Sequence, residues 1–405
     1  MSTVRDRVVG LERIRAGDLE DHPSNWRRHP RRQRAALRAV LEEIGWAGAL
    51  IARREGDRTI LIDGHLRKSL HPDAPVPVLI LDVSAEEAEQ LLVTLDPIGA
   101  LARPDPASLN DLLDRVRFSN DAVADLLEEL ARSAKLDVHS LVADPDDAPA
   151  AAIARAHPGD VWSLGEHRLV CGDATDRATL ERGLGGVRAD IVVTDPPFGV
   201  SYTGKTRDQL TIANDGADGI RSLLTAAFAN VAEVLAEGAP IYVFSPAGPL
   251  HLEFLRAFVG AGWRFRQGLV WDKGAPVIGH GDYHFAHEPI LFGYAPSPRG
   301  KGRGVAGWYG GDDKTSVIHV PKPARSREHP TMKPIELLRQ LISNSSRRHQ
   351  VVFDPFLGSG STLIASELLG RRCVGIEIDP RYCDVVLARF EAITGVEPTL
   401  VDLPR

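Results

Sequence analysis

The sequence has few cysteines, no long apolar run and no excess of positive charge. Its three cysteines, Cys171, Cys373 and Cys383, have neither the spacing of zinc ligands nor the density of a disulfide framework. No uninterrupted apolar stretch approaches the length of a membrane-spanning helix, and the N-terminus has no signal-peptide pattern. We therefore expect a protein of a reducing cytoplasm, with no metal site and no membrane partner.

The acidic balance of the chain limits where a nucleic acid can bind. The net charge is −7, so any contact with DNA has to come from local basic patches. A content of 43% hydrophobic and 25% charged residues is that of a soluble globular protein. At 405 residues the chain is long enough for two or three domains with sizeable cores.

Residues 1–95 predict a small domain of mixed α and β structure. A helical stripe ends at Gly45, a natural residue for a helix end; the stripe consists of Leu37, Val40, Leu41 and Ile44. Short strand patterns follow at residues 50–53 and 59–62. Further on, Ser84-x-x-Glu87 has the capping-box pattern of a helix start.

Two short motifs of this domain resemble the N-terminal domain of the ParB/sulfiredoxin-like family. They are Asn25-Trp26-Arg27 and, after a strand, Asp63-Gly64-His65-Leu66-Arg67. The partition proteins of that family grip nucleotide phosphates with a Gly-Glu-Arg-Arg box, and this chain lacks the Glu. The resemblance therefore implies the fold of the domain without its nucleotide chemistry. A basic run fits phosphate contact or, more commonly, a solvated helix face; it comprises Arg27, Arg28, Arg31, Arg32 and Arg34.

The middle of the chain predicts two helices and a linker. Residues 96–142 hold two apolar stripes at helical spacing, which predict a helical hairpin packed on the first domain. Residues 143–156 are rich in Asp, Ala and Pro and predict a linker. From residue 157 to residue 405 strand and helix patterns alternate, which predicts a doubly wound α/β sheet.

The motif Asp195-Pro196-Pro197-Phe198 follows the apolar strand pattern of residues 191–193. Two consecutive prolines make the backbone rigid and leave its carbonyl groups free to accept hydrogen bonds. An acid, a free carbonyl group and an aromatic ring at a strand end can hold a planar ring that carries an amino group. This chemistry fits methylation of a nucleobase amine, although the tetrapeptide alone fits a proline-stiffened turn equally well.

A second motif, FDPFLGSGST at residues 353–362, places glycines between a strand and a helix. Without Cβ atoms they let a ligand approach the backbone and the helix N-terminus. The spacing differs from that of a dinucleotide fold, and no phosphate-gripping Lys follows. One strand later, Glu377 stands where an acid can hold both hydroxyls of a ribose. The pair favours a nucleoside without phosphates.

Four motifs together look like those of β-type amino-directed DNA methyltransferases. They are DPPF, FLGSG, GIEID and the hexapeptide His329-Pro330-Thr331-Met332-Lys333-Pro334, and the target motif precedes the cofactor motif as in the β-type order. The resemblance covers residues 158–395. It implies a Rossmann-like seven-stranded methyltransferase fold that is circularly permuted. It also implies S-adenosyl-L-methionine as the cofactor, double-stranded DNA as the partner, and a homodimer.

The resemblance assigns roles to individual residues. The catalytic residues would be Asp195, Pro196, Pro197 and Phe198. The cofactor would be held by a loop of Phe356, Gly358, Ser359 and Gly360, with Glu377 on the ribose and with Asp354, Thr331 and Lys333 near the methionine portion. Lys333 also fits an exposed lysine at a helix entry.

Chain length supports the permuted order independently. Only one helix pattern follows Glu377, so the strand whose acid faces the cofactor's adenine must come from elsewhere in the sequence. Asp173, at the end of HRLVCGD, is the candidate. A plain turn after Gly172 is an equal alternative.

The target is expected to be the exocyclic N6 of a flipped adenine. Members of the resembled family that act on cytosine N4 usually have Ser in place of Asp195, so cytosine N4 is the alternative on the same fold. Cytosine C5 methylation needs a nucleophilic Cys after a proline, and none of the three cysteines follows one. A rival of another class is a DNA-binding or partition-type protein with an inactive methyltransferase half.

Sequence recognition is expected from residues 275–328. This stretch is basic in an acidic protein and therefore suits phosphate contact. Its cations are Arg299, Lys301, Arg303, Lys314, Lys322, Arg325 and Arg327. The loop after DPPF, with Lys205 and Arg207, is expected to close over the bound base.

Overall fold

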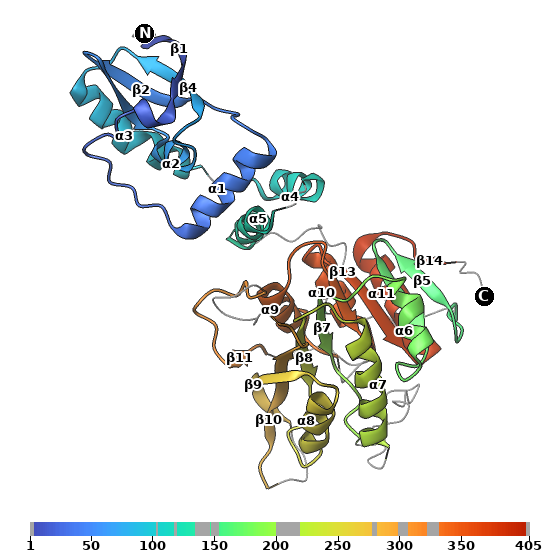
Figure 1. The fold of residues 1–405 in the computed structure, drawn as a ribbon. Helices are drawn as coiled ribbons and strands as arrows, with labels where there is room; N and C mark the ends of the chain where they lie inside the picture. The colour runs from blue at the N-terminus through green and yellow to red at the C-terminus, as the bar shows by residue number, and fades with distance from the viewer. Residues whose placement is uncertain are drawn as a thin grey trace. The chain divides into compact units, whose positions relative to one another are not determined.

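The computed structural model describes residues 4–102, 104–116, 120–133, 146, 154–199, 219–277, 282–298, 307–321 and 332–401. The chain forms two compact units, Met1–Leu136 and Asp137–Arg405, each with its own core (Figure 1).

The first unit is built on a four-stranded sheet of order β1-β4-β2-β3. Its strands are β1 (Val8–Arg15), β2 (Leu50–Glu55), β3 (Arg58–Asp63) and β4 (Pro75–Leu81). β2 and β4 pair in parallel, and the two outer strands pair antiparallel to their neighbours. Side chains of Leu50, Leu61 and Val78 are fully buried and form the centre of its core.

Five α-helices and a short 3₁₀ turn complete the described part of the first unit. They are η1 (Ala16–Asp18), α1 (Arg31–Glu43), α2 (His65–Leu70), α3 (Ala85–Ala100), α4 (Pro106–Arg115) and α5 (Asp121–Ser133). The capping box at the start of α3 is confirmed: the Ser84 hydroxyl accepts from the Glu87 N–H, and Glu87 accepts from the Ser84 N–H. Helix α3 runs without a break through residue 95, where the sequence predicted the first domain to end, and the extent of that domain stays a prediction.

Arginines of the basic run are engaged inside the first unit. Arg27 pairs with Asp63 at 3.4 Å and with Asp96 at 2.9 Å, and Arg67 pairs with the other oxygen of Asp63 at 2.8 Å. Arg32 pairs with an acid of α5 and donates to a backbone carbonyl of that helix. These contacts favour a structural use of Arg27 and Arg32 over phosphate contact.

The second unit contains a ten-stranded sheet of order β11-β9-β10-β8-β7-β12-β13-β6-β5-β14. Its strands are β5 (Val161–Leu164), β6 (His167–Cys171), β7 (Ile191–Thr194), β8 (Pro240–Phe244), β9 (Arg264–Val277), β10 (Phe285–Tyr294), β11 (Val317–His319), β12 (Val351–Asp354), β13 (Arg372–Glu377) and β14 (Thr399–Leu400). The seven strands that the resemblance implies correspond to the central part of this sheet, from β9 to β6. The short strands β11, β5 and β14 extend its edges.

Most of the central strands run in parallel. β6, β13, β12, β7 and β8 pair in parallel, and the expected hairpin of β9 and β10 is confirmed as an antiparallel pair joined to β8. A parallel sheet is normally covered on both faces, so its strands are apolar throughout. β7 shows this directly, since all four of its residues are buried.

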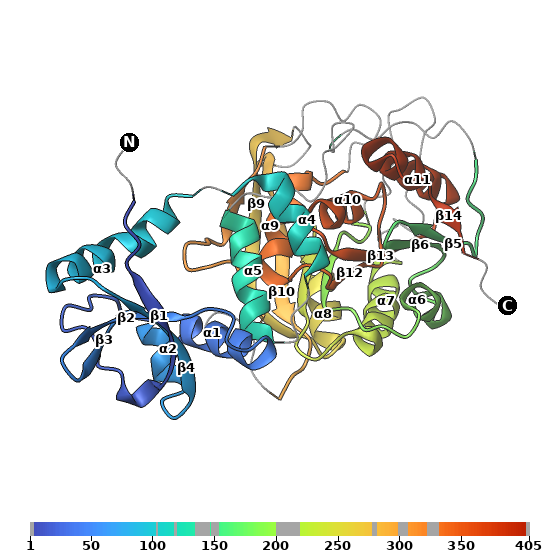
Figure 2. The same ribbon diagram turned by 90° about the horizontal axis from the view of Figure 1, so that it is seen from above.

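Helices cover both faces of this sheet (Figure 2). One face carries α9 (Ile335–Ser345), α10 (Ser361–Leu368) and α11 (Pro380–Thr394), which pack on the odd-numbered residues of β7, Ile191 and Val193. The other face carries α6 (Arg177–Leu184), α7 (Ile220–Val234) and α8 (His251–Gly260), which pack in the core that contains Val192. The doubly wound architecture is therefore confirmed.

One residue of the predicted linker is tied to the second unit. The Asp146 carboxylate accepts a hydrogen bond of 3.0 Å from the backbone N–H of Ile335, the first residue of α9. A carboxylate at a helix N-terminus satisfies an otherwise unpaired donor and favours the positive end of the helix dipole. The contact stabilises the start of α9 close to Lys333.

Candidate active site

The predicted catalytic and cofactor residues stand at one edge of the second sheet. Asp195 follows β7, Asp354 ends β12, Glu377 ends β13 and Asp173 follows β6. These strands are parallel neighbours, so their carboxyl ends meet at the same edge. The helix after β12 covers one face and the helix after β7 covers the other. Ligands of open α/β sheets bind beside the strand ends at such a switch point.

Hydrogen bonds join the ends of these neighbouring strands. The Thr194 hydroxyl donates to Asp354 Oδ1 at 2.7 Å and so links β7 to β12. The backbone N–H of Gly172 donates to the Glu377 carbonyl at 2.9 Å and links β6 to β13. The catalytic motif and the cofactor motif, which are far apart in the sequence, thus become immediate neighbours.

The two carboxylate oxygens of Asp195 differ in their hydrogen bonding. Its Oδ2 accepts from Lys333 Nζ at 2.5 Å. Its Oδ1 is buried and has no hydrogen-bond partner among the residues that the structure describes. A buried acceptor without a partner is costly, which makes it a candidate for a ligand donor.

Burial raises the pKa of Asp195 to about 6, opposed by the charge of Lys333 and reinforced by that of Glu288. Burial also lowers the pKa of Lys333, but the charges of Asp195 and Glu288 outweigh it and raise the pKa overall. Lys333 therefore stays an ammonium, and Asp195 is a carboxylate at neutral pH that takes up a proton in mildly acidic solution.

Phe198 lies beside the same ammonium group. Lys333 Nζ stands 5.4 Å from the centroid of the Phe198 ring and 5.0 Å from that of Phe244. The Phe198 ring also meets the ring of Phe254 edge to face, with 5.9 Å between centroids. These contacts hold the ring of the motif in a fixed orientation, and its use as a platform for a base stays a prediction.

The glycine motif forms a tight turn between β12 and α10. Gly358 has φ +56° and Gly360 has φ +85°, and both values favour glycine. A Cβ atom on Gly360 would stand 3.1 Å from the methyl groups of Val386. Asp354 is almost fully buried at the start of the turn, where its Oδ1 also accepts from the Phe356 N–H at 3.1 Å.

Glu377 is joined to this turn. One of its oxygens accepts from the Gly358 N–H at 2.8 Å and the other from the Asp379 N–H at 2.9 Å. Burial raises the pKa of Glu377 to about 7 and that of Asp354 to about 6. Each carboxylate oxygen has a second lone pair, so Glu377 can still accept two hydroxyl donors.

Asp173 makes the contacts of a turn residue. Its Oδ1 accepts from the Thr175 N–H at 2.8 Å, and its carbonyl accepts from the Asp176 N–H at 3.1 Å. Its strand is the neighbour of β13, as the expected role requires. The role of Asp173 in the cofactor site stays a prediction.

The structure adds three residues that the sequence did not single out. Glu288 of β10 lies 3.3 Å from Lys333, and Lys273 of β9 lies 2.6 Å from Glu288. Arg389 of α11 is fully buried and donates to the Ser359 carbonyl at 2.9 Å and to the Ser361 hydroxyl at 3.1 Å. The sequence held a signal for Arg389, because it is an arginine among the apolar residues of the last helix. No local pattern marked Glu288 or Lys273.

Of the cations predicted to contact DNA, only Lys314 belongs to the described residues. Lys205, Arg207, Arg299, Lys301, Arg303, Lys322, Arg325 and Arg327 lie outside them, and so does Thr331 of the expected cofactor site. Lys314 is exposed and pairs with Asp313 at 3.1 Å.

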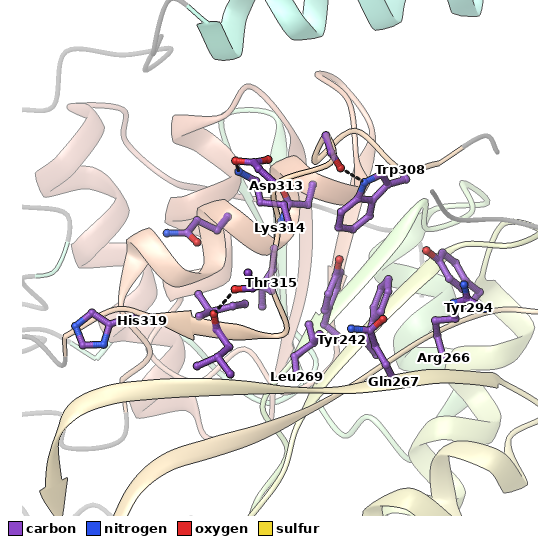
Figure 3. A pocket seen from close by; sticks show the side chains of 17 residues that line it. Tyr242, Arg266, Gln267, Leu269, Tyr294, Trp308, Asp313, Lys314, Thr315 and His319 are labelled. Carbon is purple, nitrogen blue, oxygen red and sulfur yellow. Dashed lines mark hydrogen bonds and ion pairs between the residues drawn. The ribbon is translucent and has the colours of Figure 1, made fainter. Parts of the chain in front are cut away.

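Lys314 lines a cavity of about 430 Å³ beside α9 and the β9–β10 hairpin (Figure 3). Aromatic side chains contribute to its walls, namely Tyr242, Phe292, Tyr294 and Trp308, and Arg266 adds a second cation. Neither Asp195 nor Glu377 is among the lining residues that the structure describes. The cavity is therefore separate from the acidic edge of the sheet.

Residues 189–388 match the model of a family described as DNA methylase, N6_N4_Mtase. The chain is 30% identical over 212 residues to the putative methylase YubD of Escherichia coli (strain K12), covering 51% of this chain and 84% of that protein. It is 41% identical over 69 residues to the type II methyltransferase M2.MboI of Moraxella bovis, covering 17% of this chain and 25% of that one.

The chain also resembles solved protein structures. The putative DNA modification methylase TTHA0409 of Thermus thermophilus, complexed with S-adenosyl-L-methionine, matches with a TM-score of 0.41 and 24% identity over 56% of this chain and 93% of that one. The M1.HpyAVI–SAM complex matches with a TM-score of 0.41 and 19% identity over 55% of this chain and 98% of that one.

The chain belongs to the N6/N4 DNA methylase family. This membership confirms the expected class of enzyme, a DNA methyltransferase, and supports S-adenosyl-L-methionine as its cofactor. Within the described residues, no helix is long and apolar enough to cross a membrane, and no cluster of potential metal ligands is present.

The rate of methyl transfer is expected to fall as the pH is lowered through about 6. Burial raises the pKa of Asp195 to that value, and a protonated carboxyl loses acceptor capacity at the site. Single-turnover rates over a pH series that brackets this value measure the effect. A rate that stays constant down to the ordinary pKa range of a carboxyl group would contradict it.

Arg389→Met is expected to weaken binding of S-adenosylmethionine by roughly 10- to 100-fold. The hydrogen bonds from Arg389 to Ser359 and Ser361 fix the glycine turn, and hydrogen bonds from a charged donor contribute about 1.5–3 kcal/mol. Titration calorimetry measures the affinity. Arg256→Met, which removes an exposed guanidinium on α8, is the matched control and should bind as the wild type does. Equal affinities for both variants would show that the turn does not depend on Arg389.

Proposed function

We propose that this protein transfers a methyl group from S-adenosylmethionine to the exocyclic N6 of an adenine flipped out of double-stranded DNA. The observation that carries the proposal is the open Oδ1 of Asp195, a buried acceptor at the end of β7 beside two prolines. An amine that donates one hydrogen to this oxygen and the other to the Pro196 carbonyl satisfies both acceptors.

These two hydrogen bonds address the main chemical obstacle. The lone pair of an adenine amine is conjugated with the ring, so the amine is a poor nucleophile. Two acceptors on its hydrogens turn the lone pair toward the sulfonium methyl group, and positioning for in-line displacement then lowers the barrier. The new N–C bond would form as the S–C bond breaks, the sulfonium would leave as a neutral thioether, and the extra proton of the amine would pass to the Asp195 carboxylate that it already contacts. Phe198 is the platform for the flipped base.

The acidic edge of the sheet suits a cationic cofactor. Phe356, Gly358, Ser359 and Gly360 form the loop on which the cofactor lies, and Glu377 holds the ribose hydroxyls. Asp354 lies near the methionine portion, together with Thr331, and Asp173 faces the adenine ring. Lys333 was expected near the methionine portion as well, but its ammonium group is already paired with Asp195, so its main role is to hold that carboxylate. A sulfonium and an ammonium brought to this edge reduce the repulsion among its buried carboxylates.

The order of the strands supports a circularly permuted methyltransferase. The strand beside β13 is β6, which comes from the beginning of the second unit rather than from its end. The chain therefore contributes the target motif first and the cofactor turn later, on adjacent strands of one sheet.

Adenine is favoured over cytosine by Asp195, because the cytosine-N4 enzymes that the motif resembles usually have Ser at this place. Residues 275–328 recognise the target sequence, and Lys314 together with Phe292, Tyr294 and Trp308 of the cavity wall are described parts of that region. The first unit is an accessory domain of the ParB-like type.

The test uses methyl-labelled S-adenosylmethionine, unmethylated DNA and digestion of the product to nucleosides. Label is expected in N6-methyladenine with the wild type. With Asp195→Ala it should fall by roughly 10²–10³-fold, a loss typical of one lost polar contact to the reacting group, while cofactor binding persists. Label in N4-methylcytosine would replace the adenine assignment, and absence of label on DNA despite cofactor binding would overturn the proposal.

A further inference from the structure

Four charged side chains of alternating sign form a chain behind the catalytic motif. Asp195 Oδ2 contacts Lys333 Nζ at 2.5 Å, Lys333 Nζ lies 3.3 Å from Glu288 Oε2, and Glu288 Oε1 contacts Lys273 Nζ at 2.6 Å. The four come from three places in the sequence: the end of β7, the entry to α9 and the β9–β10 hairpin.

The chain is withdrawn from solvent. The side chains of Lys333, Lys273 and Glu288 are only 8%, 11% and 16% exposed, and that of Asp195 at the end of the chain is 27% exposed. A buried charge is tolerated when it is paired, and removal of one partner leaves the other uncompensated. Here two cations and two anions balance, so the charge state of each member depends on the other three.

The position of Lys333 follows from this balance. Asp195 attracts the ammonium from one side and Glu288 from another, while the rings of Phe198 and Phe244 contact it at 5.4 and 5.0 Å. Lys333 therefore occupies one oxygen of Asp195 and leaves the other open. Without Glu288 the ammonium has Asp195 as its single carboxylate among these four residues and can move to bridge both of its oxygens.

We infer that Glu288 and Lys273 are positioning residues for methyl transfer, which hold Lys333 on one oxygen of Asp195 and so keep the other free for the target amine. The inference rests on the proposed function, and it concerns residues outside the four motifs on which that proposal was built. Neither residue touches the reacting atoms; both act through Lys333.

The two residues act on Asp195 with opposite sign. Burial is the largest cause that raises the pKa of Asp195; Lys333 opposes it, the charge of Glu288 raises this pKa further, and the charge of Lys273 lowers it. Asp354 is a further charged group that faces Asp195 across the sheet edge. Loss of the Glu288 charge must therefore lower the pKa of Asp195, and loss of the Lys273 charge must raise it.

The experiment measures single-turnover methylation of unmethylated DNA against pH for the full-length wild type, Glu288→Gln, Glu288→Asp and Lys273→Met. Glu288→Gln is expected to slow the maximal rate by about tenfold or more, the scale of one pKa unit of interaction, and to move the acid limb to lower pH. Lys273→Met is expected to move the limb to higher pH. Glu288→Asp, which keeps the charge, should restore most of the rate and the wild-type limb.

Glu181→Gln on α6 is the control, since it removes an exposed acid that pairs with Arg177 on its own helix and is not among the charges that act on Asp195, so the limb should stay in place. Thermal melting and cofactor titration identify any variant that fails to fold, and Lys273→Met and Glu288→Asp then decide the question. Limbs that do not move, or that move in the same direction for Glu288→Gln and Lys273→Met, would overturn the inference while the wild type still methylates DNA. A wild type that does not methylate DNA would instead overturn the proposed function.

Discussion

The contact between Lys333 and Asp195 joins two segments of the candidate active site that are far apart in the sequence. It joins the entry to α9 to the residue after β7, and both are held in place by neighbouring contacts. Asp146 accepts from the first residue of α9, and Thr194 ties the end of β7 to Asp354 on β12. Asp195, the acid proposed to face the target amine, is thereby fixed to the strand that begins the glycine turn.

The acidic edge also explains why the fold suits a cationic methyl donor. Burial raises the pKa of Asp195, Asp354 and Glu377, which shows that the protein interior opposes their ionised forms. Lys333 compensates one of them directly. A sulfonium held at this edge, as proposed, would supply a further positive charge, so cofactor binding and ionisation of the remaining acids would favour each other.

Sequence patterns predicted the parts of the site that lie within single motifs. DPPF, the glycine turn and Glu377 each sit at the end of an apolar strand, and adjacent parallel strands bring such ends together. Glu288 and Lys273 were missed because their role depends on cross-strand pairing in the β9–β10 hairpin and on a lysine some forty residues further along the chain, which no local pattern encodes. Helix α3 continues past residue 95 and contains Pro97, although a proline usually favours the end of a helix.

The most direct measurement of the central claim is a titration of the Asp195 carboxyl by difference infrared spectroscopy, comparing the wild type with Asp195→Asn. The protonated-carboxyl band of Asp195 is expected to appear as the pH falls through about 6, because burial outweighs the charge of Lys333. A carboxyl that titrates in the ordinary range of an exposed aspartate would contradict this expectation, since burial would then not outweigh the charge of Lys333.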